Sequence, residues 1–272
     1  MESGAEKENQ ILIASFITFR LKKLQMIGQY QLPMFALGRV IFYGGAIDAK
    51  PHKHPLWQLC LPCQNSMLNG QLLSTAAIIA PNQDHQLTMP QGWIVLAEPE
   101  SLLGAAIGEL FLAFPNGKLP QIPILVQPNA TALIQAFSSF PKLVSALTQN
   151  DYLCQDLRLR ALLARLDSCF EGACLKPEHW RAKEVAQELG ISESYFLHLV
   201  KSELGISWRP YLLWRRLICA MSAIKNGNSA TNAAHLAGFS DSAHLSRTVK
   251  ATFGMTCSQL LTSFQQNSQF VQ

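Results

Sequence analysis

Two hydrophobic patterns divide the chain at about residue 130. Between Gln31 and Phe114, short apolar stretches such as ALGRVIFYGG, PLWQLCLP and GWIVLAEP are separated by Gly, Pro and Asn. Stretches of this length, with closely spaced turn signals, predict the strands of an all-β barrel or sandwich. From about Thr131 onward, apolar residues recur at helical intervals. The pattern therefore predicts an α+β, two-domain protein with an N-terminal β-barrel and a C-terminal all-α domain.

The clearest helical segment runs from Asp156 to Phe170. Five leucines are expected to lie close to one buried face of this helix: Leu157, Leu159, Leu162, Leu163 and Leu166. Between the two patterns, residues 115–150 contain five prolines. This stretch predicts a connecting segment with one or two short helices, such as Ala130 to Ser139.

An internal repeat marks the C-terminal domain. The segments ELGISESYFLHLVKSELGIS, residues 188–207, and LAGFSDSAHLSRTVKATFGMT, residues 236–256, align almost without a gap. Each copy predicts a short helix, a glycine turn at Gly190 or Gly238, a capping serine at Ser192 or Ser240, and a second helix. This order of elements is that of a helix-turn-helix DNA-binding unit.

The spacing of apolar residues predicts which side of each second helix is free. The buried stripes are expected at Phe196, Val200 and Leu204 in the first copy and at Leu245, Val249 and Phe253 in the second. Small or basic residues remain on the other side, and these suit a major-groove contact. The candidate DNA-binding residues are Ser194, Leu197, His198, Lys201, Ser242, Ala243, Ser246, Arg247 and Lys250.

These motifs resemble those of the AraC/XylS family of transcription regulators. The family pattern is matched by Ala234, Gly238-Phe239, Arg247 and Phe253-Gly254, and residues 211–224 resemble the helix that links the two units. The resemblance covers about residues 156–261. It departs from the family at Cys257, where proline is usual, and at His198, where arginine is frequent.

The resemblance implies the role of each candidate residue. Ser194, Leu197 and His198 would face bases in the first unit, and Ala243, Ser246 and Arg247 in the second, while Lys201 and Lys250 would lie near phosphates. It also implies double-stranded DNA and RNA polymerase as partners and a homodimer as the assembly. No catalytic residues and no cofactor are expected, so the chain is not expected to be an enzyme.

Histidines in the N-terminal domain resemble those of a cupin barrel. His52 and His54 form an H-x-H pair, which on a strand would point to one face, and His85 follows a proline-bearing turn. Three histidines suit zinc or iron, so a cupin metalloenzyme or metal sensor is the alternative function. Gln58 stands where a metal cupin commonly has glutamate, which favours contact with a small-molecule effector. The candidate effector residues are His52, His54, Trp57, Gln58 and His85.

Four segments are therefore predicted. They are an N-terminal extension, 1–30; a cupin-like effector or dimerisation domain, 31–128; a helical linker, 129–155; and a DNA-binding domain, 156–272, with helix-turn-helix units at about 180–204 and 230–253. Trp57, Trp93 and the apolar run from Leu102 to Phe114 are expected to fill the barrel and to form a dimer-facing helix.

Charge and composition agree with this division. Residues 156–272 hold 13 of the 22 Lys and Arg residues and 9 of the 18 Asp and Glu residues, so the positive excess lies entirely there. The longest apolar run, Ile11 to Phe19, is too short to span a membrane. The acidic first residues do not match a secretory signal, and the chain has an odd number of cysteines, seven. We therefore expect a cytoplasmic protein with reduced thiols.

Overall fold

A computed structural model describes residues 34–36, 38–119, 122, 130–149, 152–171 and 180–265. The predicted extension, 1–30, lies outside the described residues. The strands are β1 (Met34–Ala36), β2 (Arg39–Asp48), β3 (Trp57–Pro62), β4 (Met67–Leu68), β5 (Gln71–Leu72), β6 (Ala76–Ile79), β7 (Leu87–Ala97) and β8 (Lys118–Leu119). The helices are α2 (Leu102–Ala113), α3 (Ala130–Ala136), α4 (Pro141–Leu147), α5 (Leu157–Glu171), α6 (Ala182–Glu188), α7 (Glu193–Leu204), α8 (Trp208–Lys225), α9 (Ala230–Leu236), α10 (Ser242–Phe253) and α11 (Cys257–Gln265). Among these residues, no helix combines the length and hydropathy that crossing a membrane requires.

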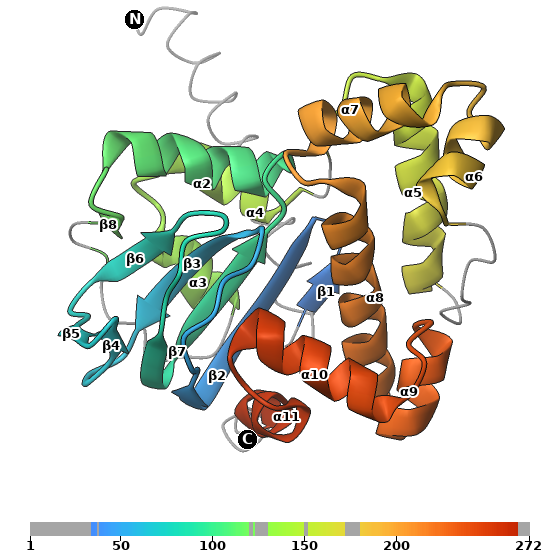
Figure 1. The fold of residues 1–272 in the computed structure, drawn as a ribbon. Helices are drawn as coiled ribbons and strands as arrows, with labels where there is room; N and C mark the ends of the chain where they lie inside the picture. Colours follow the sequence, from blue (N-terminus) through green and yellow to red (C-terminus); the bar gives the residue numbers. More distant parts are fainter. Residues whose placement is uncertain are drawn as a thin grey trace, which may run out of the picture.

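The strands form one curled antiparallel sheet, a half-barrel, in the order β1-β2-β7-β3-β6-β8. The short strands β4 and β5 form a hairpin that pairs with β7. Asn69 and Gly70 connect them with φ values of +51° and +75°, the left-handed conformation that a two-residue hairpin turn requires. Helices make up the C-terminal part (Figure 1), so the predicted α+β fold class is confirmed.

Both faces of the sheet are buried. Because side chains alternate along a strand, Tyr43 and Trp93 lie on one face, packed edge to face with ring centres 5.4 Å apart. Phe42 and Ile94, their neighbours in the chain, lie on the other face. The first face shares a core with residues of α2, α3 and α4. The second face lies against residues of α8, α10 and α11, in a larger core that extends to α5, α6, α7 and α9. Strands buried on both faces are apolar without interruption, as the segments VIFYGG and GWIVLA are.

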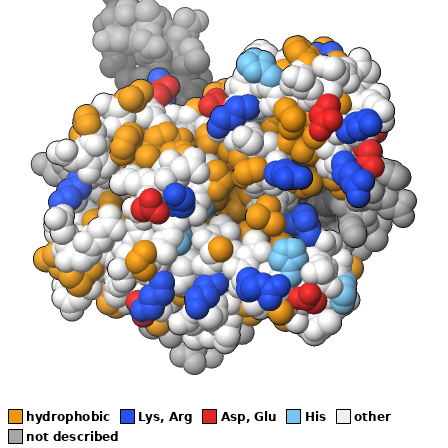
Figure 2. All heavy atoms as spheres, viewed as in Figure 1, with side chains coloured by type: hydrophobic (Ala, Val, Ile, Leu, Met, Phe, Trp, Pro, Cys, Tyr) orange, Lys and Arg blue, Asp and Glu red, His pale blue; other side chains and the backbone are white. Residues whose placement is uncertain are grey.

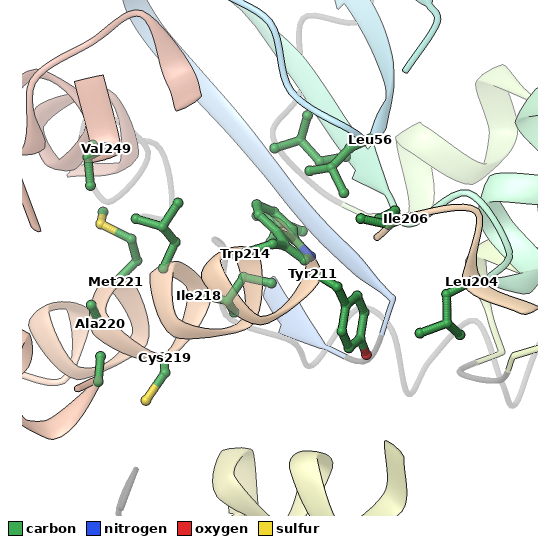
Figure 3. Packing of buried hydrophobic residues seen from close by; sticks show 14 of the residues in the cluster. Leu56, Leu204, Ile206, Tyr211, Trp214, Ile218, Cys219, Ala220, Met221 and Val249 are labelled. Carbon is green, nitrogen blue, oxygen red and sulfur yellow. The ribbon is translucent and has the colours of Figure 1, made fainter. Parts of the chain in front are cut away.

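Helix α8 joins the sheet to the helical part. Figure 3 shows Tyr211, Trp214 and Ile218 of α8 in the same buried hydrophobic cluster as Leu56, which precedes β3. Leu56 and Tyr211 are fully buried and Trp214 is 2% exposed. The N-terminal sheet and the C-terminal helices therefore share one continuous hydrophobic core.

A buried polar network crosses this core. Glu98, directly after β7, accepts hydrogen bonds from the indole Nε1 of Trp214 at 2.9 Å and from the hydroxyl of Tyr152 at 2.8 Å. Its carboxylate lies 3.9 Å from the guanidinium of Arg215, and both side chains are almost completely buried. A buried charge needs such partners because it has lost its hydration. The network therefore fixes the register of α8 on the sheet.

Two expectations about single residues are wrong. Leu159, Leu162, Leu163 and Leu166 are buried in α5, but Leu157 is 77% exposed because it is the first residue of the helix and projects beyond the core. Cys219 is disulfide-bonded, so the expectation of reduced thiols fails at this residue.

The buried ion pair gives a stability prediction. Replacing Glu98 by Gln should lower the free energy of unfolding by about 3 kcal/mol, because it removes the carboxylate charge that faces buried Arg215. The matched control is Glu109→Gln, in the exposed pair of Glu109 with Lys142, which should change it by less than about 1 kcal/mol. Urea unfolding followed by tryptophan fluorescence measures both. Equal effects of the two substitutions would contradict the role given to Glu98.

Candidate DNA-binding surface and histidine cluster

The first helix-turn-helix unit consists of α6 and α7. Ser192 has an extended backbone and its Oγ accepts a hydrogen bond from the N–H of Tyr195 at 3.2 Å, so it caps α7 as predicted. Gly190 has a φ of +69° in the turn before it. The N–H of Ile191 donates to the carbonyl of Ala186, which closes the end of α6.

The second unit consists of α9 and α10, and Arg216 of α8 holds its turn. Gly238 has a φ of +77°, and the N–H of Phe239 donates to the carbonyl of Ala234 at 2.8 Å. Arg216 donates from Nε to the carbonyl of Ala237 at 2.9 Å and from Nη2 to the carbonyl of Gly238. Its guanidinium also lies 4.6 Å from the centre of the Phe239 ring. Ala234, Gly238 and Phe239 of the predicted motif, together with Arg216, therefore build the turn.

Asp241, and not Ser240, caps α10. The N–H of His244 donates to Asp241 Oδ1 at 2.6 Å, while Ser240 Oγ donates to Asp241 Oδ2 at 3.0 Å. The prediction that Ser240 caps this helix is wrong. The turn glycines of the two units are 48 residues apart, whereas α7 and α10 begin 49 residues apart, at 193 and 242. The second unit thus has one extra residue before its recognition helix.

The second helix of each unit buries the predicted stripe. Phe196, Val200 and Leu204 of α7 and Leu245 and Val249 of α10 are buried. Phe253 is only half-buried, and its ring centre lies 6.3 Å from that of Trp214.

The opposite side of each recognition helix faces outward. The side chain of Leu197 is 41% exposed. Figure 2 shows Lys and Arg side chains spread over the molecular face that carries α7, α8 and α10. Ser242 is half-buried and the other eight candidate DNA-binding residues are exposed: Ser194, Leu197, His198, Lys201, Ala243, Ser246, Arg247 and Lys250.

Some side chains on this surface already have partners. Lys201 Nζ donates to the carbonyl of Gly205 at 2.8 Å, which places its charge at the C-terminal end of α7. His244 contacts Ser240 Oγ at 3.2 Å and packs against Phe239 with ring centres 5.2 Å apart. His244 therefore supports the turn.

Both recognition helices end against the N-terminal sheet. A Cβ on Gly205, after α7, would lie 2.9 Å from Cβ of Pro99. At the end of α10, the N–H of Lys50 donates to the carbonyl of Gly254 at 2.9 Å. No local pattern indicates these two contacts, because they join residues more than one hundred positions apart. They place α7 and α10 at opposite ends of the β2–β7 pair.

The three candidate histidines lie together. His52 and His85 form an isolated antiparallel bridge, with backbone N–H to carbonyl distances of 3.0 and 2.9 Å. His54 lies in the loop before β3, so the expectation that the H-x-H pair lies on a strand is wrong. One ring nitrogen of each histidine lies within 4.8 Å of the others.

Hydrogen bonds determine where each ring carries its proton. His52 Nδ1 lies 2.8 Å from the carbonyl of Lys50, and His85 Nδ1 lies 2.9 Å from that of Gln83. His54 Nε2 lies 2.9 Å from Oε1 of Gln58. Because these oxygens only accept, the facing nitrogens donate, and the lone pairs lie on the other ring nitrogens.

Burial keeps the rings neutral at pH 7. It lowers the pKa of His52 and that of His54 to about 4, and it lowers the pKa of His85. Within the described residues, His54 Nδ1 and His85 Nε2 are buried without a hydrogen-bond partner. The cluster therefore presents three neutral imidazoles, two of which have an unused buried nitrogen.

The structure brings four of the five candidate effector residues together. Gln58 Nε2 donates to Cys60 Sγ at 3.1 Å, which turns its Oε1 toward His54. Trp57 is different, because its side chain packs on the opposite face of the sheet, against Phe111 of α2, with ring centres 5.4 Å apart. Beside the cluster is a cavity of about 120 Å³, lined by both apolar and polar side chains, among them His85, Phe111 and Lys118.

Comparison with known proteins supports the assignment of the helical part. The helix-turn-helix domain family matches residues 185–263. Thermoregulatory protein LcrF of Yersinia pestis and virulence regulon transcriptional activator VirF of Yersinia enterocolitica are each 23% identical over 209 residues, covering 76% of this chain and 73% of theirs. A crystal structure of an apo ToxT variant from Vibrio cholerae has a TM-score of 0.48 and 15% identity, covering 84% of this chain and 98% of ToxT.

Ser240 and Asp241, directly before α10, give a prediction about the cap of this helix. Asp241→Ala should lower the Tm by roughly 2–4 °C, the usual effect of losing a helix cap in a protein of this size. Ser240→Ala, the neighbouring control, should lower the Tm by less than roughly 1 °C because the cap remains. Circular dichroism at 222 nm during heating measures both. A larger loss for Ser240→Ala would show that the cap is misassigned.

Proposed function

We propose that the chain is a transcription regulator of the AraC/XylS family and that it places α7 and α10 in two successive major grooves of its DNA site. The observation that carries this proposal is the repeated unit, whose two recognition helices lie at opposite ends of α8 (Figure 1). Helix α8 has 18 residues and is roughly 27 Å long. This length is close to the separation of successive grooves on one face of DNA, roughly 34 Å.

The exposed side chains of α10 suit direct contact with bases. Arg247 presents a guanidinium that can donate two hydrogen bonds to guanine, and Ala243 and Ser246 are small enough for close approach. On α7, the exposed apolar side chain of Leu197 suits the methyl group of thymine. Ser194 and His198 supply hydrogen-bonding groups beside it. The two helices therefore present different chemistry to their half-sites.

Phosphate contacts are assigned to the flanking polar residues. Lys201 and Lys250 are exposed near the ends of their helices, and Ser242 lies in the first turn of α10. Such contacts position a protein on DNA without distinguishing sequences. The positive excess of residues 156–272 supports the same surface.

The N-terminal sheet is assigned the regulatory role. The cavity beside His85 supports binding of a small-molecule effector there, because it combines apolar side chains with polar ones and one cation, Lys118. Homodimer formation and contact with RNA polymerase complete the proposal and are supported by the family resemblance. Each of these roles is a binding role, and the proposal includes no catalytic step.

Substitutions in α10 test the assignment of base and phosphate contacts. Once genome-wide mapping of bound DNA has given a site, Arg247→Ala should weaken binding to it by about 1–3 kcal/mol while binding to a shuffled duplex changes little. Lys250→Ala should weaken binding to both duplexes and reduce the salt dependence by about one counterion. Fluorescence anisotropy at several salt concentrations measures each effect.

A distant lysine provides the control. Lys142→Ala removes one positive charge from α4, at an exposed pair with Glu109, and should leave both affinities unchanged. If Arg247→Ala bound the mapped site as tightly as the unchanged protein, the assignment of α10 would be wrong. If mapping enriched no site, the proposed function would fail as a whole.

A further inference from the structure

The histidine cluster has a binding capacity that DNA recognition does not use. The hydrogen bonds leave a lone pair on His52 Nε2, His54 Nδ1 and His85 Nε2. Each of these three histidines offers one ligand nitrogen, and the three ligand nitrogens lie within 4.8 Å of one another. A buried polar atom without a partner costs free energy, so in a folded protein it calls for a partner such as a water molecule or an ion. Two of these three nitrogens are such atoms among the described residues.

We propose that His52, His54 and His85 bind one divalent transition-metal ion, with zinc as the first candidate, and that the ion braces the end of α10 against the sheet. Imidazole nitrogen is a ligand that zinc, copper, nickel and iron share, whereas magnesium and calcium prefer oxygen. Three protein ligands leave a fourth position of a tetrahedral site to another ligand. His52 is only half-buried, so an ion can reach the site from solvent.

The surroundings of the cluster support a metal more than a purely polar pocket. Each ring donates its other nitrogen to a fixed oxygen: the carbonyls of Lys50 and Gln83 and the side chain of Gln58. Metal-binding histidines commonly have such partners, which set the tautomer and the ring orientation.

A short path connects the cluster to the DNA-binding surface. The carbonyl of Lys50 accepts from His52 Nδ1, and the N–H of Lys50 donates to the carbonyl of Gly254 at the end of α10. A Cβ on Gly254 would lie 2.7 Å from His52 Nδ1, so the backbone of this turn touches the ring. A metal that fixes the His52 ring therefore stabilises the contact on which the turn after α10 rests.

Metal binding by the three histidines does not depend on the proposed function. Only the expected effect of the metal on DNA binding rests on that function. Protein prepared without a polyhistidine tag and treated with chelator should bind one Zn²⁺ per chain in isothermal titration calorimetry. Co²⁺ should give the strong visible absorption of a tetrahedral site, without the near-ultraviolet band of thiolate ligands, which separates this site from the free cysteines.

Substitutions separate the cluster from other histidines. His52→Ala should weaken Zn²⁺ binding at least tenfold, and the fold should tolerate it because His52 is half-buried. His235→Ala, at an exposed histidine of α9, is the matched control and should leave binding unchanged. Gln58→Leu should weaken binding about tenfold, as expected when an outer partner of a metal-binding histidine is lost. Failure to bind one ion, or equal binding by the His52→Ala protein, would overturn the site.

Hydrogen exchange tests the bracing of α10. Zn²⁺ should slow amide exchange in residues 250–257 of the unchanged protein but not in His52→Ala. Zn²⁺ should also tighten binding to the mapped DNA site at least fivefold, because the second recognition helix is held in place. Zn²⁺ binding without slower exchange would overturn the bracing. If the unchanged protein bound no DNA site either with or without Zn²⁺, the proposed function would be contradicted. The metal site would still stand on the Zn²⁺ binding measured by calorimetry.

Discussion

Burial of the second face of the sheet beneath the DNA-binding helices determines the organisation of this protein. Phe42, Ile94 and Leu96 meet Trp214 and Ile218 in one apolar core. Burying one such side chain contributes about 1.5–3 kcal/mol, whereas a buried ion pair such as Glu98 with Arg215 returns little net stability after desolvation. The apolar contacts therefore hold the two parts together, and the polar network selects their register. A helix-turn-helix region without the sheet would expose this face of α8 to water.

The residues that carry the resemblance to the family are mostly those that shape the turn. Ala234, Gly238, Phe239 and Arg216 contact one another, and each of them is wholly or partly buried. Of the motif residues, Arg247 is the one on the exposed side of α10. A match to this motif therefore establishes the shape of the unit, while the base preference depends on the exposed residues, which the motif leaves open.

Local features were predictable from the sequence, and long-range ones were not. The recognition helices, their buried stripes and the Ser192 cap follow from periodicity and capping chemistry within a dozen residues. The cap at Asp241 was missed because the repeat gains one residue at that point. Trp57 was assigned to the effector site with Gln58, but adjacent residues of a strand point to opposite faces. The uninterrupted apolar strands signalled burial on both faces, a pattern that a closed barrel and a sheet covered by helices on both sides share.

The sheet also sets the separation of the two recognition helices. Pro99, beside Gly205, follows β7, and Lys50, beside Gly254, follows β2, at the other end of the same antiparallel pair. The ten residues of β2 span at most roughly 33 Å, near the distance between successive major grooves. Gly254 must be glycine for two reasons, a φ of +65° that ends α10 and a Cβ position that would collide with the carbonyl oxygen of Lys50. The first reason is local and the second comes from the sheet, so one residue links the end of α10 to the N-terminal sheet.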